Sequence, residues 1–225
     1  MKTAYLFDID GTLLKVRHKA NRKIIQQLLA RFGMTEIDVA ELDFAGKTDR
    51  DIFSSLLGNP SDDLFDRVKK AYLKELDHNL KQDDVHIFAG VHEVLDYLRN
   101  ASSWVGLLTG NFAEAAKIKL ARTGLENNFR FGAFGDDHHH RNDLPATAFA
   151  DLLAFSGESF HPSDLIIIGD TPRDIECAHS FGAVAVAVAT GGYSHDELQA
   201  HRPAAVLSSM DEFPEWNEHH LKKVS

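Results

Sequence analysis

The sequence predicts an α/β fold, with a Rossmann-like, doubly wound core around a parallel sheet and an inserted all-helical cap. Two features predict it: apolar runs of strand length alternate with helical patterns, and roughly 95 residues separate the first two runs. A single crossover between parallel strands needs far fewer residues than this, so we expect a separate unit to be inserted between them.

The strands of the core are predicted at residues 3–7, 104–108, 165–168 and 184–188, with a weaker one at 131–134. Each is a short apolar run of the kind that is buried on both faces of a parallel sheet. Apolar residues at helical spacing predict helices at 90–100, 112–123 and 145–155, between these runs. Helices in these connections would cover both faces of the sheet.

The cap is predicted at residues 16–84, which leaves 1–15 and 85–225 for the core. Within it two segments carry apolar residues along one helical face and no strand pattern is found. These faces consist of Ile24, Ile25, Leu28, Leu29 and Phe32 in the first segment and Leu64, Phe65, Val68, Ala71 and Tyr72 in the second. An insertion directly after the first strand is expected to close over the end of that strand.

Composition limits the partners and the setting of this protein. Of 225 residues, 44% are hydrophobic and 26% are charged, and the formal net charge is −10, which argues against a nucleic-acid partner and favours a small molecule. No run approaches the roughly 18 apolar residues of a membrane span. A single cysteine, Cys177, allows no intrachain disulfide, and the first residues lack the apolar region of a signal peptide, so we expect a cytoplasmic protein. The oligomeric state does not follow from composition.

Two carboxylates, Asp8 and Asp10, directly follow the first predicted strand, and Gly11 after them permits a turn that brings the two together. Further polar segments follow three other predicted strands, at residues 109–111, 136–141 and 169–174. Because open α/β sheets bind ligands at the carboxyl ends of their strands, we expect all four segments to meet at one edge of the sheet.

With these motifs the chain resembles the haloacid dehalogenase superfamily, in its phosphoglycolate-phosphatase-like branch with a helical cap. Asp8 to Thr12, in the order Asp-Ile-Asp-Gly-Thr, matches the first motif of that family, Thr109 matches the second, and Gly169 and Asp170 with Asp174 match the fourth. The resemblance covers essentially the whole chain. It implies a phosphatase that hydrolyses small phosphorylated metabolites with Mg²⁺ as cofactor.

The resemblance implies roles for the two leading carboxylates. Asp8 would attack phosphorus and form an aspartyl-phosphate, which splits one difficult hydrolysis into two easier steps. Asp10 would protonate the leaving oxygen and then take a proton from the attacking water. Mg²⁺ would be held by Asp8, the backbone carbonyl of Asp10, and Asp170, since it prefers oxygen ligands. Asp174 either reaches the ion through a water molecule or caps a helix at 175–181.

Phosphate oxygens would be bound by the Thr109 hydroxyl and by the backbone N–H groups of Gly110 and Asn111 at a helix N-terminus. The Asn111 side chain has an alternative role as the N-cap of that helix. The third motif departs from the family, because many relatives carry a lysine there and this chain does not. Arg141 is the best substitute, with its guanidinium directed at Asp8 and phosphate; a solvent-exposed Arg141 is the alternative.

Other residues have weaker claims on the site. Lys47, in the sequence Gly46-Lys47-Thr48-Asp49, resembles a substrate-contact loop and would set specificity, although a solvated lysine and an Asp49 that only caps a helix at 50–57 explain the same pattern. The histidines at 138–140 are expected to form a solvated loop, because three consecutive side chains do not converge on one metal ion.

Two other functions stay open at this point. A phosphomutase of the beta-phosphoglucomutase type would use the same core if the cap excluded water. A non-catalytic binding protein that retains the fold is the alternative from another class. The intact set of Asp8, Asp10, Thr109 and Asp170 argues against it, because clustered like charges are costly without a function.

Overall fold

The computed structural model describes residues 2–39, 44–136 and 138–224. Its centre is a parallel sheet of six strands in the order β5-β4-β1-β6-β7-β8. The strands are β1 (Ala4–Phe7), β4 (Trp104–Leu108), β5 (Gly132–Ala133), β6 (Leu165–Gly169), β7 (Val184–Val188) and β8 (Ala205–Leu207). The five strands predicted from apolar runs are confirmed, whereas β8 was not identified because its three residues are too few for a pattern.

The helices around the sheet lie where the sequence predicted them, including the one expected at 175–181, and α8 and α9 near the C-terminus are additions. They are α4 (Val91–Asn100), α5 (Ala113–Ala121), α6 (Leu144–Ser156), α7 (Pro172–Phe181), α8 (His195–Ala200) and α9 (Phe213–Val224). Short 3₁₀ turns occur at Gln82–Asp84, Glu126–Asn128, Arg141–Asp143, Pro162–Asp164 and Met210–Glu212.

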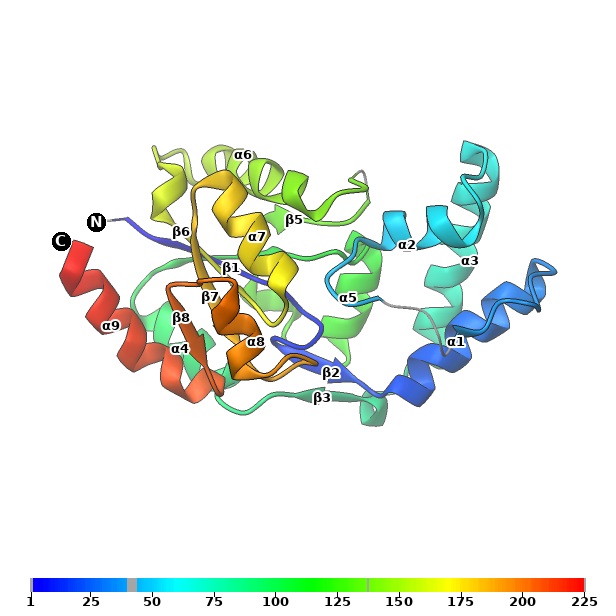
Figure 1. Cartoon of the computed structure of the whole chain (residues 1–225), viewed down its shortest axis with the longest axis horizontal. Coiled ribbons are helices and arrows are strands. Elements are labelled where there is room, and N and C mark those ends of the chain that lie inside the picture. The colour runs from blue at the N-terminus through cyan, green and yellow to red at the C-terminus, as the bar shows by residue number, and fades with distance from the viewer. Residues whose placement is uncertain (1, 40–43, 137, 225) are drawn as a thin grey trace.

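Alternate residues of β1 belong to two separate apolar clusters, as the two-residue period of a strand requires. Tyr5 and Phe7 belong to a cluster with buried residues of α4, α5 and α9. Ala4 and Leu6 belong to a second cluster with buried residues of α6 and α7. Figure 1 shows α6 and α7 above the sheet and α4 and α9 below it. The doubly wound core is therefore confirmed.

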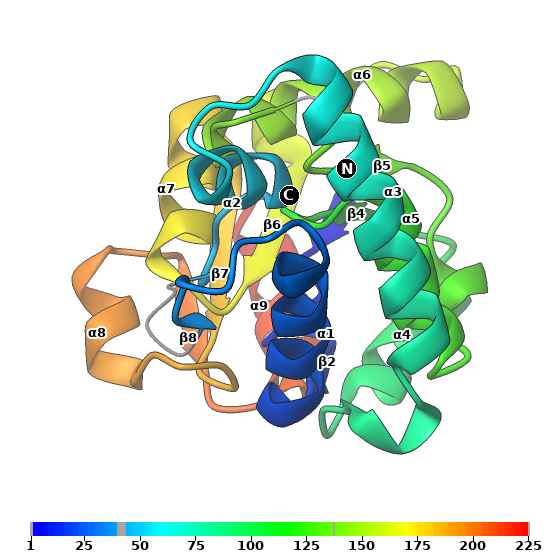
Figure 2. The same ribbon diagram turned by 90° about the vertical axis from the view of Figure 1, so that its right-hand side faces the viewer.

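The segment between β1 and β4 forms a helical unit at the opposite end of the molecule from the two chain termini (Figure 1). Its helices are α1 (His18–Arg31), α2 (Asp49–Leu56) and α3 (Asp62–Asn79), and Figure 2, which faces this end, shows α1 and α3 in front of the sheet. The helical faces predicted for residues 24–32 and 64–72 are largely buried, so we call this unit the cap.

A short antiparallel pair, β2 (Leu14–Val16) with β3 (Val85–Ile87), lies where the chain enters and leaves the cap. This pair was not predicted, because three residues on each side do not establish an alternating pattern. The predicted cap limits at residues 16 and 84 fall at this pair and remain a prediction.

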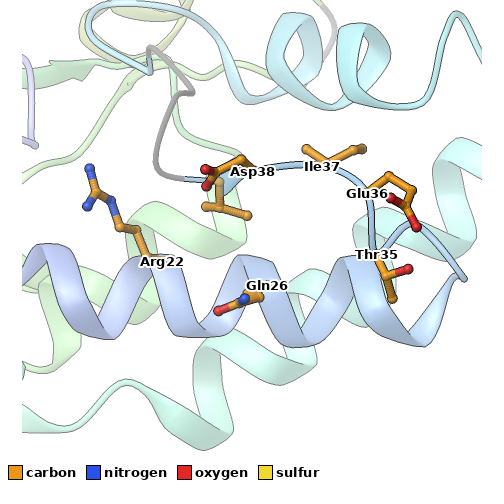
Figure 3. A pocket seen from close by; sticks show the side chains of 7 residues that line it. Arg22, Gln26, Thr35, Glu36, Ile37 and Asp38 are labelled. Atoms are coloured by element: carbon orange, nitrogen blue, oxygen red, sulfur yellow. The ribbon is translucent and has the colours of Figure 1, made fainter.

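The described helices include none that is both long and apolar enough to cross a membrane. A pocket of about 330 Å³ lies between α1 and the loop that follows it, and Figure 3 shows side chains from both segments around it. Its lining comes from residues 22–39 of the cap and includes none of the predicted site residues. This pocket is therefore separate from the residues predicted at the carboxyl edge of the sheet.

Candidate active site

The loops after β1, β4 and β6 meet at one edge of the sheet because these three strands are direct neighbours. Gly11 has a positive φ of 92°, and a Cβ on it would lie 2.2 Å from an Asp170 carboxylate oxygen. A Cβ on Gly191, in the loop after β7, would lie 1.7 Å from the same oxygen. Both glycines are needed for the loops to approach Asp170 this closely.

Asp8 lies at the centre of a buried cluster formed by a strand end, a 3₁₀ turn and a helix start of the core. The Arg141 guanidinium contacts the Asp8 carboxylate at 3.0 Å and the Asp174 carboxylate at 2.5 Å. Arg141 is 7% exposed, so the alternative of a solvated Arg141 is wrong. The structure thus places the Arg141 guanidinium against Asp8, and its role in place of the missing lysine remains a prediction.

The charges of this cluster do not balance. Burial raises the pKa of Asp8 to about 6, although the Arg141 guanidinium acts in the opposite direction. Burial and the charge of Asp174 raise the pKa of Asp170 to about 8. Burial lowers the pKa of Arg141, but Asp174 and Asp8 raise it more, so the guanidinium stays charged. One guanidinium therefore leaves a deficit of positive charge beside three carboxylates.

Both carboxylate oxygens of Asp174 accept hydrogen bonds from neighbouring residues. Its Oδ1 accepts the bond from Arg141, while its Oδ2 accepts bonds from the Thr171 N–H at 3.0 Å and the Thr171 hydroxyl at 2.7 Å. The suggestion that Asp174 is the N-cap of a helix at 175–181 is wrong in position. The helix α7 begins at Pro172 with Thr171 as its N-cap, and Asp174 occupies the third helical position of a capping box.

The residues present fit a hard divalent cation. Asp8, Asp170 and Asp174 each offer a carboxylate oxygen, and these oxygens lie within 4.8 Å of one another. Oxygen donors of this kind suit Mg²⁺. The unbalanced negative charge is the independent reason for a cation here, and the engaged oxygens of Asp174 leave Asp8 and Asp170 as the better candidates for direct contact.

The Asp10 carboxylate is bound in a different network from that of Asp8. Its Oδ2 accepts hydrogen bonds from Asn111 Nδ2 at 2.7 Å and from Lys119 Nζ at 2.5 Å. Lys119 also donates to Asn111 Oδ1 at 2.5 Å, and Asn111 Nδ2 lies 2.9 Å from the Thr109 hydroxyl oxygen. The side chain of Asp10 is 39% exposed, compared with 8% for Asp8. Two carboxylates only two residues apart therefore have different environments.

Thr109 and Asn111 are both buried, at 0% and 6% exposure. The alternative of Asn111 as a helix N-cap is wrong, because Phe112 occupies that position before α5 and the Asn111 side chain instead contacts Asp10 and Thr109. Gly110 lies between them, and a Cβ there would stand 2.1 Å from the Lys47 carbonyl oxygen of the cap. The second motif is thus close to both Asp10 and the cap.

Lys119 is the residue of this site that the sequence analysis missed. It lies on α5, where most neighbouring residues are apolar and buried, namely Ala115, Ala116, Ile118 and Leu120. A lysine on the buried apolar side of a helix, in contrast to the exposed Lys117 two residues earlier, is a signal that a search for catalytic motifs does not use. That pattern would have identified Lys119 as a buried cation that needs an anionic partner.

The cap loop with Lys47 packs directly on the core. The Asp49 N–H donates to the Gly110 carbonyl at 2.6 Å, and Asp49 Oδ2 accepts from the Phe112 N–H at 2.8 Å. Burial raises the pKa of Asp49 to about 6, while the charge of Lys119 lowers it. Asp49 as the cap of a helix at 50–57 is wrong, since Thr48 is the N-cap of α2. The role of the Lys47 side chain in specificity remains a prediction.

A second contact between cap and core centres on Asp136, in the loop after β5. Lys69 of α3 donates to Asp136 Oδ1 at 2.6 Å, and Arg50 of α2 donates to the Asp136 carbonyl at 2.8 Å. Lys69 also lies over the ring of Phe112, and Phe53 of the cap stacks on that ring with centroids 5.8 Å apart. These contacts hold the cap against the core in this structure.

The remaining residues singled out in the sequence have simpler roles. His139 and His140 are exposed and His138 contacts the Thr147 hydroxyl, which agrees with a loop rather than a metal site. Asp137 of the same segment lies outside the described residues. Cys177 is fully buried, and its thiol donates to the Arg141 carbonyl, so it packs below the site.

This geometry agrees with the comparison against protein families. Residues 5–188 match the family model described as haloacid dehalogenase-like hydrolase. The chain belongs to this family. The match runs from β1 to β7 and includes the cap, so the haloacid dehalogenase-like hydrolase comprises both parts of the structure.

Individual relatives are distant but span most of this hydrolase. A pyrophosphatase, PpaX, from Bacillus velezensis is 25% identical over 218 residues, covering 93% of this chain and 94% of that protein. A phosphoglycolate phosphatase from Nitrosococcus oceani is 25% identical over 164 residues, 72% and 71% of the two chains. The crystal structure of a beta-phosphoglucomutase from Clostridium difficile has a TM-score of 0.73 at 18% identity and covers 100% of this chain and 99% of that chain. This last likeness shows the fold alone.

Proposed function

We propose that this hydrolase is a Mg²⁺-dependent phosphatase that cleaves small phosphate monoesters through a phosphorylated Asp8. The observation that carries the proposal is the contrast between Asp8 and Asp10. Asp8 is buried beside Arg141 and two further carboxylates, whereas Asp10 is partly exposed and bound by Asn111 and Lys119. Carboxylates with different environments take different chemical roles, one as nucleophile and the other as acid and base.

In the first step an Asp8 carboxylate oxygen forms a bond to phosphorus as the bond to the leaving oxygen breaks. Asp10 transfers its proton to that leaving oxygen, which departs as an alcohol. The product on the enzyme is an aspartyl-phosphate at Asp8. Arg141, at 3.0 Å from Asp8, is placed to bind both the attacking carboxylate and phosphate oxygens.

In the second step Asp10, now deprotonated, takes a proton from a water molecule whose oxygen forms a bond to phosphorus. The bond between phosphorus and Asp8 breaks, and inorganic phosphate and the free carboxylate remain. The Thr109 hydroxyl and the N–H groups of Gly110 and Asn111 are proposed to bind phosphate oxygens in both steps. Asp10 thus ends each cycle protonated, ready for the next ester.

Asp8, Asp170 and the backbone carbonyl of Asp10 are proposed to hold Mg²⁺, with Asp174 fixing Arg141 and contacting the ion at most through water. When bound, the ion neutralises the approaching anions and orients the phosphate. The deficit of positive charge at Asp8 and Asp170 supports this proposal. We also propose, from the relatives, that substrates are small phosphorylated metabolites such as phosphoglycolate or pyrophosphate, met in the cytoplasm, with Lys47 contributing to their selection.

A phosphomutase is the second candidate, because the cap loop lies directly on Gly110 and a closed site excludes water. The two candidates differ in where the phosphoryl group goes. Incubation with a hexose phosphate and its bisphosphate would yield an isomer with a mutase and inorganic phosphate with a phosphatase.

The proposed function is tested by phosphate release from p-nitrophenyl phosphate, with and without Mg²⁺, followed by a panel of phosphorylated metabolites. We expect release that requires Mg²⁺ and is lost in Asp8→Asn. Undiminished turnover in Asp8→Asn would refute the role of Asp8. No release from any ester by the unaltered protein would instead favour the non-catalytic binding protein.

A further inference from the structure

Lys119 has an environment that a surface lysine does not have. It is 6% exposed and lies in α5 among buried apolar residues. Burying an ammonium group is costly unless it is paired and hydrogen-bonded. Its Nζ lies 2.5 Å from Asp10 Oδ2 and 2.5 Å from Asn111 Oδ1, so the charge is directed at one point of the site.

The partner of this buried charge is the carboxylate that must transfer protons. Asn111 and Lys119 both donate to Oδ2 of Asp10, which fixes that oxygen and leaves Oδ1 for proton transfer. Asn111 is in turn fixed by the Thr109 hydroxyl oxygen. Two bonds to one oxygen restrict rotation of the carboxylate about its own axis. A fixed orientation of the acid raises the reaction rate, since a small displacement of a catalytic group lowers that rate strongly.

We propose that Lys119 is a positioning residue that holds the Asp10 carboxylate in its proton-transferring orientation. This inference rests on the proposed function, because it assigns a task within that reaction. Lys119 does not contact the substrate in this role; it acts through Asp10. The competing explanation is that the ion pair only stabilises the packing of α5 on the core.

The two explanations predict different losses of kcat/KM for esters with different leaving groups. An alkyl ester has a poor leaving oxygen that needs the proton from Asp10, whereas p-nitrophenolate leaves without one. The value of kcat/KM reports the steps up to phosphorylation of Asp8. The ratio of kcat/KM for the alkyl ester to kcat/KM for p-nitrophenyl phosphate therefore measures the contribution of proton transfer from Asp10. Loss of packing alone would lower both values equally.

The test compares Lys119→Met, which removes the donor, with Lys119→Gln, which keeps a neutral donor. Lys117→Met is the matched control, because Lys117 is exposed on the same helix. We expect kcat/KM for an alkyl phosphate to fall about 10²-fold in Lys119→Met, with less than about 10-fold loss for p-nitrophenyl phosphate. Lys119→Gln should fall between it and the unaltered protein.

Thermal unfolding of each variant separates misfolding from misplacement. If Lys119→Met does not fold, the ester ratio of Lys119→Gln decides. Equal losses on the two esters, or no loss, in a folded Lys119 variant would overturn the inference while leaving the phosphatase intact. If the unaltered protein hydrolysed neither ester, the proposed function itself would fall, and this inference with it.

Discussion

The two sides of the site are built from different parts of the molecule. The Asp8 side consists of core residues, with Arg141 from a 3₁₀ turn and Asp174 from the first turn of α7 buried against Asp8. The Asp10 side adjoins the cap, since Asp49 of α2 bonds to the Phe112 N–H and lies close enough to Lys119 for its pKa to be lowered by that charge. Opening of the cap would therefore remove direct neighbours of the Asp10 network, whereas on the Asp8 side the cap approaches Thr171, which bonds to Asp174, and not Asp8 itself.

This contrast separates two tasks that a phosphatase must perform. The nucleophile requires a fixed arrangement of charges, which rigid strand ends provide. The acid and base must act only when substrate is enclosed. Contact of the cap residue Asp49 with this side of the site makes the surroundings of Asp10 depend on closure of the cap. Variants on the Asp8 side should thus affect stability and rate together, whereas variants at the cap should affect mainly substrate binding.

The largest effect is expected from Arg141→Ala. It leaves the buried carboxylates of Asp8 and Asp174 without their cation, which costs about 3–5 kcal/mol of unfolding free energy. Turnover should fall substantially as well, because the phosphate loses a guanidinium contact. Urea unfolding without metal and p-nitrophenyl phosphate turnover measure the two effects.

Arg141→Lys tests whether the bidentate geometry of the guanidinium matters, since lysine keeps the charge but does not make bidentate contacts. We expect stability and rate between those of Arg141→Ala and the unaltered protein. Arg130→Ala, at an exposed arginine, serves as control. Unchanged rate and stability in Arg141→Ala would show that the Asp8 side does not depend on this cation.

An intermediate effect is expected from pH and Mg²⁺. Because the folded state raises the pKa of Asp8 to about 6 and of Asp170 to about 8, it binds these protons more tightly than the unfolded chain. The stability of the metal-free protein should therefore fall as pH rises from about 5 to about 9. Mg²⁺ binds deprotonated carboxylates, so the increase in Tm that it causes should grow over the same range.

Thermal unfolding at several pH values, with EDTA or with Mg²⁺, measures this dependence. Asp170→Asn is the matched variant, and it should show a flatter pH profile and little response to Mg²⁺. Metal-free protein whose Tm rose steadily over that pH range would contradict the charge deficit on the Asp8 side.

The smallest effect is expected at the contact between cap and core. Asp136→Asn keeps an acceptor for the Ala113 N–H but removes the charge that pairs with Lys69. Both side chains are 25% exposed, and ion pairs in contact with solvent contribute at most about 1 kcal/mol, so KM should rise several-fold while Tm changes little. Steady-state kinetics at low salt measure it. Asp63→Asn, which breaks an exposed pair with Arg67 on α3, is the control and should leave KM unchanged.

Much of this arrangement follows from the sequence because strand ends carry it. Asp8, Thr109 and Asp170 each follow an apolar run, and adjacency of β1, β4 and β6 brings them together. Arg141 was instead expected as the substitute for the family's missing lysine, and it lies beyond β5, which pairs with β4 and not with β1. Apolar periodicity and strand-end chemistry are local signals, and the Asp8 side depends on little else.

The arrangement of the Asp10 side could not be predicted from the sequence, because it depends on packing between distant segments. Lys119 is eight residues from Asn111 in a helix whose apolar pattern predicts only burial, and the partner of a buried lysine is set by packing. The contact of Asp49 with Phe112 depends on how the cap sits on the core, which local periodicity does not encode. The pairing of β2 with β3 was missed because each strand has only three residues.

The division of labour between Asp8 and Asp10 is tested most directly by trapping the covalent intermediate in Asp10→Asn. p-Nitrophenyl phosphate needs no acid to leave, so Asp8 should become phosphorylated, whereas removal of the phosphoryl group lacks its base. Rapid quenching followed by peptide mass spectrometry should find one phosphoryl group on Asp8 in this variant. A variant that turned over normally, or that carried the phosphoryl group on another residue, would contradict the account.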